Sequence, residues 1–378
     1  MSDLTAKVTA SPSAWQGVPL PDRLRWTRRH MWLTAATAAR LPTLKGVRLA
    51  AAVHLDVKAA VFLEAFAAAG AEVAVTPADP ATTRTDVADH LRAHMEVFVT
   101  GPGRGRPPAE RCVAWGPSHT LEMGADITRT AAEHGYDGLR AGVEVTRTGI
   151  GTLRDLPLRH PVFDLDRVPL KNHVHNRYAV GISTWQAFMS RTNLTLHGSV
   201  VVVVGYGEVG AGLARAAAAL GGRVLVAEES AERRLIAEYE GYETGTVEAL
   251  APRADILVTA TGRDGVVSKE VLSELTAGCF LLNAGHSPRE IDLGVLRTGT
   301  QVLPHVTCHR PFGKEILLMS GGHIVNLTAG DGDSLNSFDL TAALMVSAVG
   351  WMSEHGGRYA PGVHPLPQAA WVASIENY

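Results

Sequence analysis

The sequence predicts an α/β protein with two doubly wound parallel sheets. Two stretches carry this prediction, because 46–76 and 200–227 both alternate short apolar runs with alanine-rich helical runs. Strands and helices that alternate at this spacing form parallel sheets with helices on both faces. The chain of 378 residues is long enough for two domains, each with its own core.

The same patterns locate the individual elements. Apolar and β-branched runs indicate strands, and alanine-rich runs that end at glycine indicate helices. The expected strands are 46–54, 71–76, 200–204, 223–227, 254–260 and 278–283, and the expected helices are 57–69 and 209–220. We also expect the apolar segment Leu340–Val349 to form a helix that a second copy of the chain could cover.

Composition and charge exclude several classes of protein. A net charge of −3 gives no reason to expect nucleic acid or an anionic membrane as a partner. The first fifteen residues lack the basic-then-apolar plan of a signal peptide, and no apolar run approaches the length of a membrane span. We therefore expect a cytoplasmic protein. Its three cysteines are scattered without CxxC spacing, which is typical of buried thiols in a reducing compartment.

Residues 200–229 form a complete dinucleotide-binding pattern of strand, glycine turn, helix, strand and acid. The GxGxxG spacing allows a tight turn, close approach of a pyrophosphate and tight packing of the following helix. Glu228 then ends the second strand, where an acid binds the ribose diol, and Glu228 with Glu229 would repel a 2′-phosphate, so NAD is favoured over NADP. The turn residues expected to contact NAD are Gly205, Gly207, Glu208, Val209 and Gly210.

Further short motifs run in a fixed order along nearly the whole chain. They include KGVRLAAAVH at 45–54, GYGEVGAG at 205–212, NAGHSPREID at 283–292, VNL at 325–327 and YAPGVHPLP at 359–367. Taken together, they resemble the S-adenosylhomocysteine hydrolase family. The resemblance implies two Rossmann-like domains: a substrate domain built from both chain ends, and a central NAD-binding domain. The implied boundaries are 1–180 and 334–378 for the substrate domain and 181–333 for the NAD domain.

The family's chemistry explains how a dehydrogenase-like chain could act as a hydrolase. The resemblance implies that NAD oxidises the ribose 3′-hydroxyl to a ketone, which makes the C4′ proton acidic. A base removes that proton, the 5′-thiol leaves, water adds, and the ketone is reduced again. The protein must then supply a base at the 3′-hydroxyl and proton carriers at C4′ and O5′.

Part of this machinery can be carried over by position. The resemblance implies that His54 is a proton donor near the 5′ position and that Lys171 is the base for the 3′-hydroxyl. Asn176 and His286 match other catalytic positions of the family. The implied cofactor contacts, besides the glycine turn, are Glu228, Thr259, Thr261, Gly262, Asn283 and Asn326.

The departures from the family fall on the substrate. A catalytic aspartate is Met123 here, a ribose-binding glutamate is Val145, and the aspartate that partners the lysine is His175, which could be a replacement base or a ribose contact. On the adenine side a threonine, a glutamate and a histidine become Asp56, Lys58 and Asp333. Asp126, with Thr128, and Thr146 complete the expected substrate site. The pair His173 and His175 could bind a metal on a strand, but no third ligand is in view, so no metal is expected.

These losses favour a changed substrate over lost function. One positioned acid or base contributes about a hundredfold to ten-thousandfold in rate, so S-adenosylhomocysteine should be a poor substrate. The cofactor pattern is intact. The leading hypothesis is an NAD-dependent enzyme that oxidises a sugar hydroxyl of a nucleoside-like small molecule, with net hydrolysis, elimination, epimerisation or dehydrogenation. True S-adenosylhomocysteine hydrolysis and a non-catalytic NAD-binding regulatory paralogue are the alternatives.

Assembly is a further expectation from the resemblance. Family members associate through the cofactor domain, so we expect at least a homodimer. The chain stops at Tyr378, before most of the C-terminal extension that carries a lysine and a tyrosine into a neighbouring subunit's NAD site in relatives. The family's tetramer is therefore a weaker expectation than the dimer.

Overall fold

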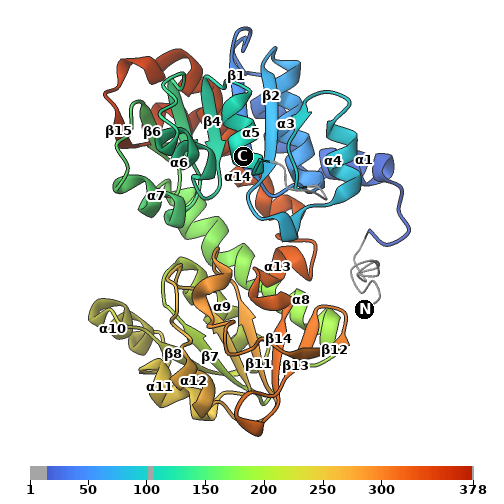
Figure 1. The fold of residues 1–378 in the computed structure, drawn as a ribbon, viewed down its shortest axis with the longest axis vertical. Coiled ribbons are helices and arrows are strands. Elements are labelled where there is room, and N and C mark those ends of the chain that lie inside the picture. The colour runs from blue at the N-terminus through green and yellow to red at the C-terminus, as the bar shows by residue number, and fades with distance from the viewer. Residues whose placement is uncertain (1–14, 101–105, 377–378) are drawn as a thin grey trace. The chain divides into compact units, whose positions relative to one another are not determined.

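The computed structural model describes residues 15–100 and 106–376, which form two compact units (Figure 1). Unit 1 contains His173–Ser334 and the described residues before Val18, and unit 2 contains the described residues of 18–172 and 335–376. The chain passes from unit 2 to unit 1 between residues 172 and 173 and returns between 334 and 335. The boundaries implied by the resemblance place the first of these crossings eight residues later and the second one residue earlier.

Unit 2 is built on a seven-stranded sheet whose neighbouring strands all run parallel. Its order is β15, β6, β5, β4, β1, β2, β3, so the winding reverses between β1 and β4. Ligands of such sheets bind beyond the carboxyl ends of the strands at this switch point. The strands are β1 Arg48–Val53, β2 Glu72–Pro77, β3 Glu96–Val97, β4 His119–Glu122, β5 Ala141–Glu144, β6 Pro161–Asp164 and β15 Gly362–Pro365.

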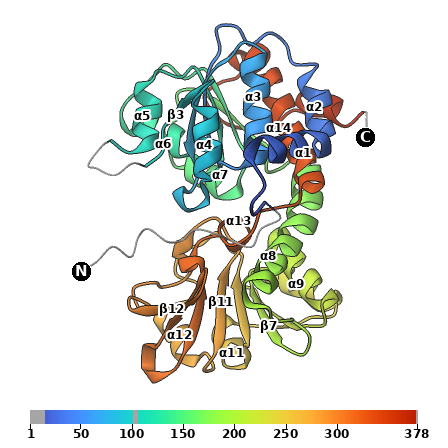
Figure 2. The same cartoon turned by 90° about the vertical axis from the view of Figure 1, so that its right-hand side faces the viewer.

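Helices cover both faces of the unit 2 sheet. On one face α1, α2, α3 and α14 pack together (Figure 2). On the other, Cys112 of α5 and Ile127 of α6 pack against Ala50 and Ala52 of β1. The helices are α1 Leu20–His30, α2 Trp32–Ala38, α3 Val57–Ala68, α4 Thr85–Leu91, α5 Pro108–Ala114, α6 Asp126–Glu133, α7 Arg147–Arg154 and α14 Leu335–His355.

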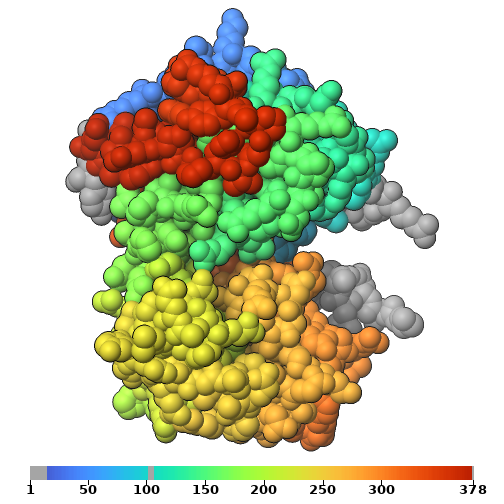
Figure 3. Space-filling view, turned by 90° about the vertical axis from the view of Figure 1, so that its left-hand side faces the viewer, coloured from blue at the N-terminus to red at the C-terminus, as the bar shows by residue number. Residues whose placement is uncertain are grey.

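The C-terminal part of the chain completes unit 2. Strand β15 pairs in parallel with β6, and Figure 3 shows the red C-terminal residues against the green residues of the same unit. The apolar segment Leu340–Val349 lies within α14, where Leu344, Met345 and Val346 are fully buried. The expectation that this segment awaits a second copy is therefore wrong, because its apolar side chains already pack inside their own chain.

Unit 1 contains an eight-stranded sheet with the order β12, β13, β14, β11, β10, β7, β8, β9. Its winding reverses between β7 and β10, and only the pairs that include β13 are antiparallel. The strands are β7 Val200–Val204, β8 Arg223–Ala227, β9 Glu243–Gly245, β10 Ile256–Thr259, β11 Cys279–Asn283, β12 Gly299–Leu303, β13 Val306–His309 and β14 Ile316–Met319. The helices are α8 Arg177–Thr192, α9 Glu208–Ala219, α10 Ala231–Tyr239, α11 Val247–Leu250, α12 Lys269–Glu274 and α13 Val325–Thr328.

Strand β7 shows why a continuous apolar run forms the centre of this unit. Val201 and Val203 belong to one hydrophobic cluster, and Val202 and Val204 belong to another. Successive side chains of a strand point to opposite faces, so a strand covered on both faces is apolar at every position. Both sheets are thus doubly wound, and the predicted α/β fold class with two Rossmann-like domains is confirmed.

Helices α8 and α9 pack closely because glycine lies at their contact (Figure 2). A Cβ at Gly181 would lie 2.4 Å from the carbonyl oxygen of Gly212, and a Cβ at Gly212 would lie 2.3 Å from that of Arg177. The close contact of α8 with α9 assigns residues 177–180 to unit 1, which explains why the first crossing lies earlier than the sequence indicated.

A π-helix, Leu170–Asn176, contains the first crossing. His173 and His175 lie on this helix, so the expected placement of the HxH pair on a strand is wrong. Short π-helical segments inside longer helices occur frequently at functional sites. Among the described residues, no helix has both the length and the apolar character to cross a membrane.

Candidate active site

The glycine turn of unit 1 lies between β7 and α9, at the switch point of the sheet. Gly205 has a φ of 96°, and a Cβ at Gly210 would lie 1.9 Å from the carbonyl oxygen of Gly205. Only glycine fits either position. A Cβ at Gly207 would meet nothing within 4 Å, so the backbone that begins α9 is open to approach. A helix N-terminus in this setting binds the pyrophosphate of a dinucleotide.

Glu228 lies beside this turn, as a ribose-binding acid must. Its side chain is 8% exposed and accepts hydrogen bonds from the backbone N–H of Tyr206 (2.7 Å) and of Ser230 (2.8 Å). These bonds hold the carboxylate at the end of β8, next to the backbone of the glycine turn. Glu229 is exposed instead and forms an ion pair with Arg263. The residues of unit 1 therefore fit NAD.

The loops after β10 and β11 are held by two buried polar side chains. Asn283 accepts from the Thr259 hydroxyl (3.1 Å) and donates to the carbonyl oxygens of Ser287 and Gly322. Glu290 accepts from Thr261 and from the backbone N–H of Gly262 (2.9 Å). Burial raises the pKa of Glu290. Four of the predicted cofactor residues thus shape the loops at the switch point: Thr259, Thr261, Gly262 and Asn283.

His175 and Asp333 form a buried pair within unit 1. The imidazole Nε2 lies 2.8 Å from Asp333 Oδ2, and the other carboxylate oxygen accepts from Ser183 (2.6 Å) and Asn326 (3.2 Å). His175 follows the first crossing of the chain and Asp333 precedes the second. The two substitutions that the sequence assigned to separate parts of the substrate site are therefore in direct contact.

A second polar group occupies the beginning of α9. Glu208 lies 3.1 Å from His173 Nδ1 and 3.4 Å from Arg177, which also donates to Glu240 (2.8 Å). The Tyr206 hydroxyl donates to the other oxygen of Glu240. Glu208 thus connects the start of α8 to α9, the helix that follows the glycine turn. His173 is 63% exposed and faces a different partner from His175, so the two do not form a common metal site.

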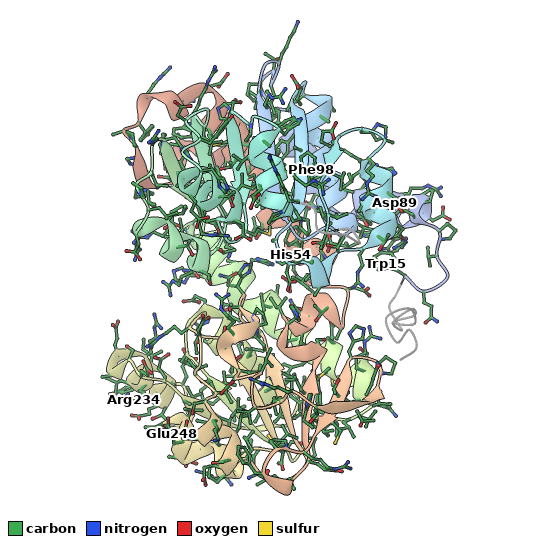
Figure 4. The ribbon with its side chains drawn as sticks, viewed as in Figure 1. Trp15, His54, Asp89, Phe98, Arg234 and Glu248 are labelled. Carbon is green, nitrogen blue, oxygen red and sulfur yellow. The ribbon has the colours of Figure 1, made fainter. Side chains whose placement is uncertain are left out.

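In unit 2, His54 directly follows β1, and Figure 4 labels it at that end of the strand. Its Nδ1 lies 2.8 Å from the Thr82 hydroxyl, which donates its own proton to the Asp79 carbonyl oxygen (2.7 Å). Since the hydroxyl has one proton, Nδ1 must be the donor in this bond. The neutral imidazole then carries its basic lone pair on Nε2, where a proton can be exchanged.

Lys171 forms a buried ion pair in unit 2. Its ammonium lies 3.0 Å from Asp166 Oδ1, and the two side chains are 9% and 7% exposed. Asp166 follows β6 by two residues, so it lies near the carboxyl end of a parallel strand. The resemblance places the family's aspartate partner of this lysine at position 175, where this chain has a histidine. The structure shows that a carboxylate is still present, supplied from a different position.

Met123 and Val145 directly follow β4 and β5, and both are buried. The glutamates before them form a pair across the two strands, because Glu122 and Glu144 are in register. Glu122 accepts from the backbone of Ile127 (2.6 Å) and Thr128, and Glu144 accepts from Gly124 and Thr146. Burial and the charge of Glu122 raise the pKa of Glu144 to about 8.

The remaining predicted residues have structural contacts as well. Thr146 accepts from the backbone of Gly149 (3.0 Å) and caps α7, and Asp126 forms an ion pair with Arg129 (3.0 Å). Asn176 immediately precedes α8, and His286 lies in the loop after β11. Sequence reasoning missed Asp166, Ser183 and the Glu122–Glu144 pair. Asp166 could have been found, because it is a carboxylate five residues before Lys171 at a strand end.

The described residues contain no group of three or more His, Cys, Asp or Glu side chains that could hold a metal ion. The three cysteines are buried as free thiols, and burial raises the pKa of Cys112 and of Cys279 to about 12. Neither cysteine has the lowered pKa that activates a thiolate nucleophile.

Comparisons with known proteins agree with this geometry. The family profile of the S-adenosyl-L-homocysteine hydrolase NAD-binding domain matches residues 176–332. The chain is 33% identical to an adenosylhomocysteinase of Thermotoga maritima, over 91% of this chain and 90% of the relative. The chain belongs to the adenosylhomocysteinase family. NAD is the cofactor, as the sequence predicted, and the chain is an NAD-dependent enzyme of the adenosylhomocysteinase type.

Relatives of this adenosylhomocysteinase-family chain differ in the nucleoside that they act on. An S-inosyl-L-homocysteine hydrolase of Methanopyrus kandleri is 32% identical over 92% of this chain and 87% of the relative. Among solved structures, a dipicolinate synthase chain of Bacillus halodurans has a TM-score of 0.51 at 16% identity, covering 82% of this chain and 99% of that one. That likeness concerns the fold alone. Membership of the family leaves the substrate open.

Proposed function

We propose that the chain uses NAD to oxidise the 3′-hydroxyl of a nucleoside-like substrate, and that it is specialised for a substrate other than S-adenosylhomocysteine. The observation that carries the proposal is the buried pair of Lys171 and Asp166. A lysine held in a desolvated position by one carboxylate is suited to exchange a proton with a hydroxyl group. Its position matches the family's base at the 3′-hydroxyl.

Three side chains have roles in this proposal. Lys171, as the neutral amine, takes the proton of the 3′-hydroxyl and becomes the ammonium that pairs with Asp166. His54 exchanges a proton near the 5′ position through Nε2, since Nδ1 is committed to Thr82. NAD supplies the reversible oxidation of the sugar, bound by the glycine turn and Glu228 of unit 1.

The apolar side chains of Met123 and Val145 support specialisation. Each stands at a position where the family has a carboxylate that acts on the sugar, and each is buried. The neighbouring Glu122 and Glu144 do not compensate, because their carboxylates bind backbone N–H groups of their own loops. A substrate that needs neither lost carboxylate would be turned over well at this site.

Hydrolysis of an S-nucleosyl-homocysteine is the second candidate. It is favoured by the relatives, whose names describe hydrolases of the adenosyl and the inosyl compound. His54 and Lys171 are both present for it. A non-catalytic role has no comparable support, because the positions for the 3′-base and the 5′ proton donor are both occupied by ionisable groups.

One experiment separates these functions. Purified protein loaded with NAD is mixed with a panel of nucleosides and their homocysteine thioethers, and near-ultraviolet absorbance reports bound NADH while thiol release is measured in parallel. Reduction without thiol release supports the specialised oxidation, and reduction with steady thiol release supports hydrolysis. Neither signal with any compound of the panel would refute both.

We further propose that the protein works on this small molecule in the cytoplasm as a homo-oligomer, without nucleic acid. Leu235, Ile236 and Tyr239 of α10 support association with a second copy, because they are 55%, 45% and 87% exposed on the NAD-binding unit. Figure 4 labels Arg234 on this helix. A monomer by light scattering at micromolar concentration would contradict the proposal.

A further inference from the structure

Lys58 places a buried ammonium group at the beginning of a helix. It is the second residue of α3, and its side chain is only 4% exposed. Burial of an ammonium is unfavourable, and the N-terminus of a helix carries partial positive charge that repels a cation. Lys58 is unfavourable for stability in both respects, and residues of this kind are expected at functional positions.

Asp56 makes this arrangement possible. One carboxylate oxygen accepts from the backbone N–H of Lys58 (2.9 Å) and Ala59 (3.0 Å) and caps α3, and the other lies 2.7 Å from the Lys58 ammonium. These bonds hold the Asp56 carboxylate in one position, and the carboxylate in turn holds the Lys58 ammonium. The pair is neutral as a whole, which lowers the cost of burial.

The pair occupies the ligand-binding end of the unit 2 sheet. β1 ends at Val53, and β1 and β4 flank the switch point, where open α/β sheets bind ligands. The proposed proton donor His54 lies with Asp56 on the connection from β1 to α3, and Lys58 is in the first turn of α3. On the helix α14, the ring of Phe338 lies under the Lys58 ammonium, 5.8 Å from it to the ring centroid, which is a cation–π contact.

We infer that Lys58 reads the base of the substrate, and that this base carries a carbonyl oxygen where adenine carries its amino group. The inference rests on the proposed function and specifies its substrate class. An ammonium group donates hydrogen bonds and cannot accept them. It can pair with the carbonyl oxygen of a 6-oxopurine, whereas the amino group of adenine would present another donor to it. The ligand class is therefore a 6-oxopurine nucleoside, as in an S-inosyl compound.

The test compares two ligands that differ at this one group. NAD-loaded protein is titrated with S-inosylhomocysteine and S-adenosylhomocysteine, and binding is measured by calorimetry alongside NAD reduction. We expect the inosyl compound to bind more tightly by at least about a hundredfold, because a buried polar contact mismatched on one side discriminates strongly. Equal binding, tighter binding of the adenosyl compound, or binding of neither would overturn the inference.

Variants show whether Lys58 causes the preference. Lys58→Met should remove it, and Lys58→Glu combined with Asp56→Thr should reverse it. Lys269→Met is the matched control, since Lys269 is also in the first turn of a helix but is exposed. Thermal unfolding checks that each variant folds. If the double variant does not fold, the role of Lys58 is tested by comparing the base preference of the wild type with that of Lys58→Met. A preference that survives in folded Lys58→Met would overturn the role of Lys58.

Failure of the proposed function gives a different result. If the inosyl compound binds preferentially but never reduces NAD, the base preference stands and the proposed oxidation fails. If both compounds reduce NAD and bind equally, the oxidation stands and the base preference fails.

Discussion

The ammonium of Lys171 lies 3.0 Å from a carboxylate oxygen of Asp166, and both side chains are buried in unit 2. The two residues are five positions apart in the sequence. The second oxygen of Asp166 lies 4.0 Å from the exposed Arg147, so the lysine is the closer cation. The resemblance places the carboxylate partner of this lysine after it in the sequence, at position 175, which is a histidine here. Asp166, which precedes the lysine, supplies the carboxylate contact instead.

Removal of the lysine amine should abolish the first chemical step. We expect Lys171→Ala to lower substrate-dependent NAD reduction by about a hundredfold to ten-thousandfold, the usual contribution of a positioned base. His54→Ala should spare this reduction more than the later steps, because His54 is proposed to act near the 5′ position. Stopped-flow absorbance of bound NADH measures both variants. If reduction in Lys171→Ala is intact, His175 becomes the better candidate for the base.

Asp166 should act through Lys171 rather than on the substrate. We expect Asp166→Asn to reduce kcat by about tenfold or more and leave KM nearly unchanged, because the amine loses the carboxylate that holds it in place. Asp166→Glu should restore part of the rate. Asp164→Asn is the control, since Asp164 pairs with Arg167 (3.2 Å). An equal loss of rate in Asp166→Asn and in Asp166→Glu would show that Asp166 is only structural.

The cofactor assignment predicts a defined effect at Glu228. Its buried carboxylate can accept the ribose hydroxyls, and the loss of such charged hydrogen bonds should weaken NAD binding by about tenfold to a hundredfold in Glu228→Ala. Fluorescence titration with NAD and NADP measures the change. Glu229→Ala, which removes an exposed ion pair, should have a much smaller effect on NAD. Equal affinity of the wild-type protein for the two cofactors would contradict the preference for NAD.

The buried contact between His175 and Asp333 should contribute to stability. Asp333→Ala leaves the His175 ring, the Ser183 hydroxyl and Asn326 without this carboxylate, and we expect a loss of about 3 kcal/mol in the free energy of unfolding. The exposed Glu133→Gln should cost less than about 1 kcal/mol. Urea unfolding measures both. A double-mutant cycle with His175→Ala should show coupling, and additive losses would refute a direct contribution of the pair.

The raised pKa of Glu144 predicts how the free energy of unfolding depends on pH. Its pKa is raised from 4.5 to about 8 by burial and by Glu122, so the folded protein keeps a proton that the unfolded chain releases. The stabilisation of the folded state that comes from this retained proton is fully present below pH 4.5 and is lost as the pH rises through about 8. Glu144→Gln keeps an oxygen acceptor and cannot ionise. Its free energy of unfolding should therefore fall less than that of the wild type between these pH values, whereas equal slopes would contradict the assignment.

Local patterns were sufficient for the strands and the glycine turn of the NAD-binding unit. Strands β7 and β8 occupy the residues expected, because valine runs covered on both faces have no alternative to a buried parallel strand. The glycine turn and Glu228 also follow from spacing, since their geometry depends on a few neighbouring residues. The expected helix 209–220 became α9, Glu208–Ala219, a shift of one residue at each end.

The substrate half depended on contacts that spacing does not encode. The sequence determined the fold class and the NAD cofactor, and its resemblance to the family indicated the loss of carboxylates at Met123 and Val145. Only the tertiary structure showed that His175 contacts Asp333, 158 residues away, and that Asp56 holds Lys58 in a buried position. Both pairs lie at chain connections, where the partner of a side chain is set by the packing of strands and helices. The hydrophobic pattern specifies which segments are buried, but the position of each charge is decided by the nearest group able to offset the cost of removing it from water.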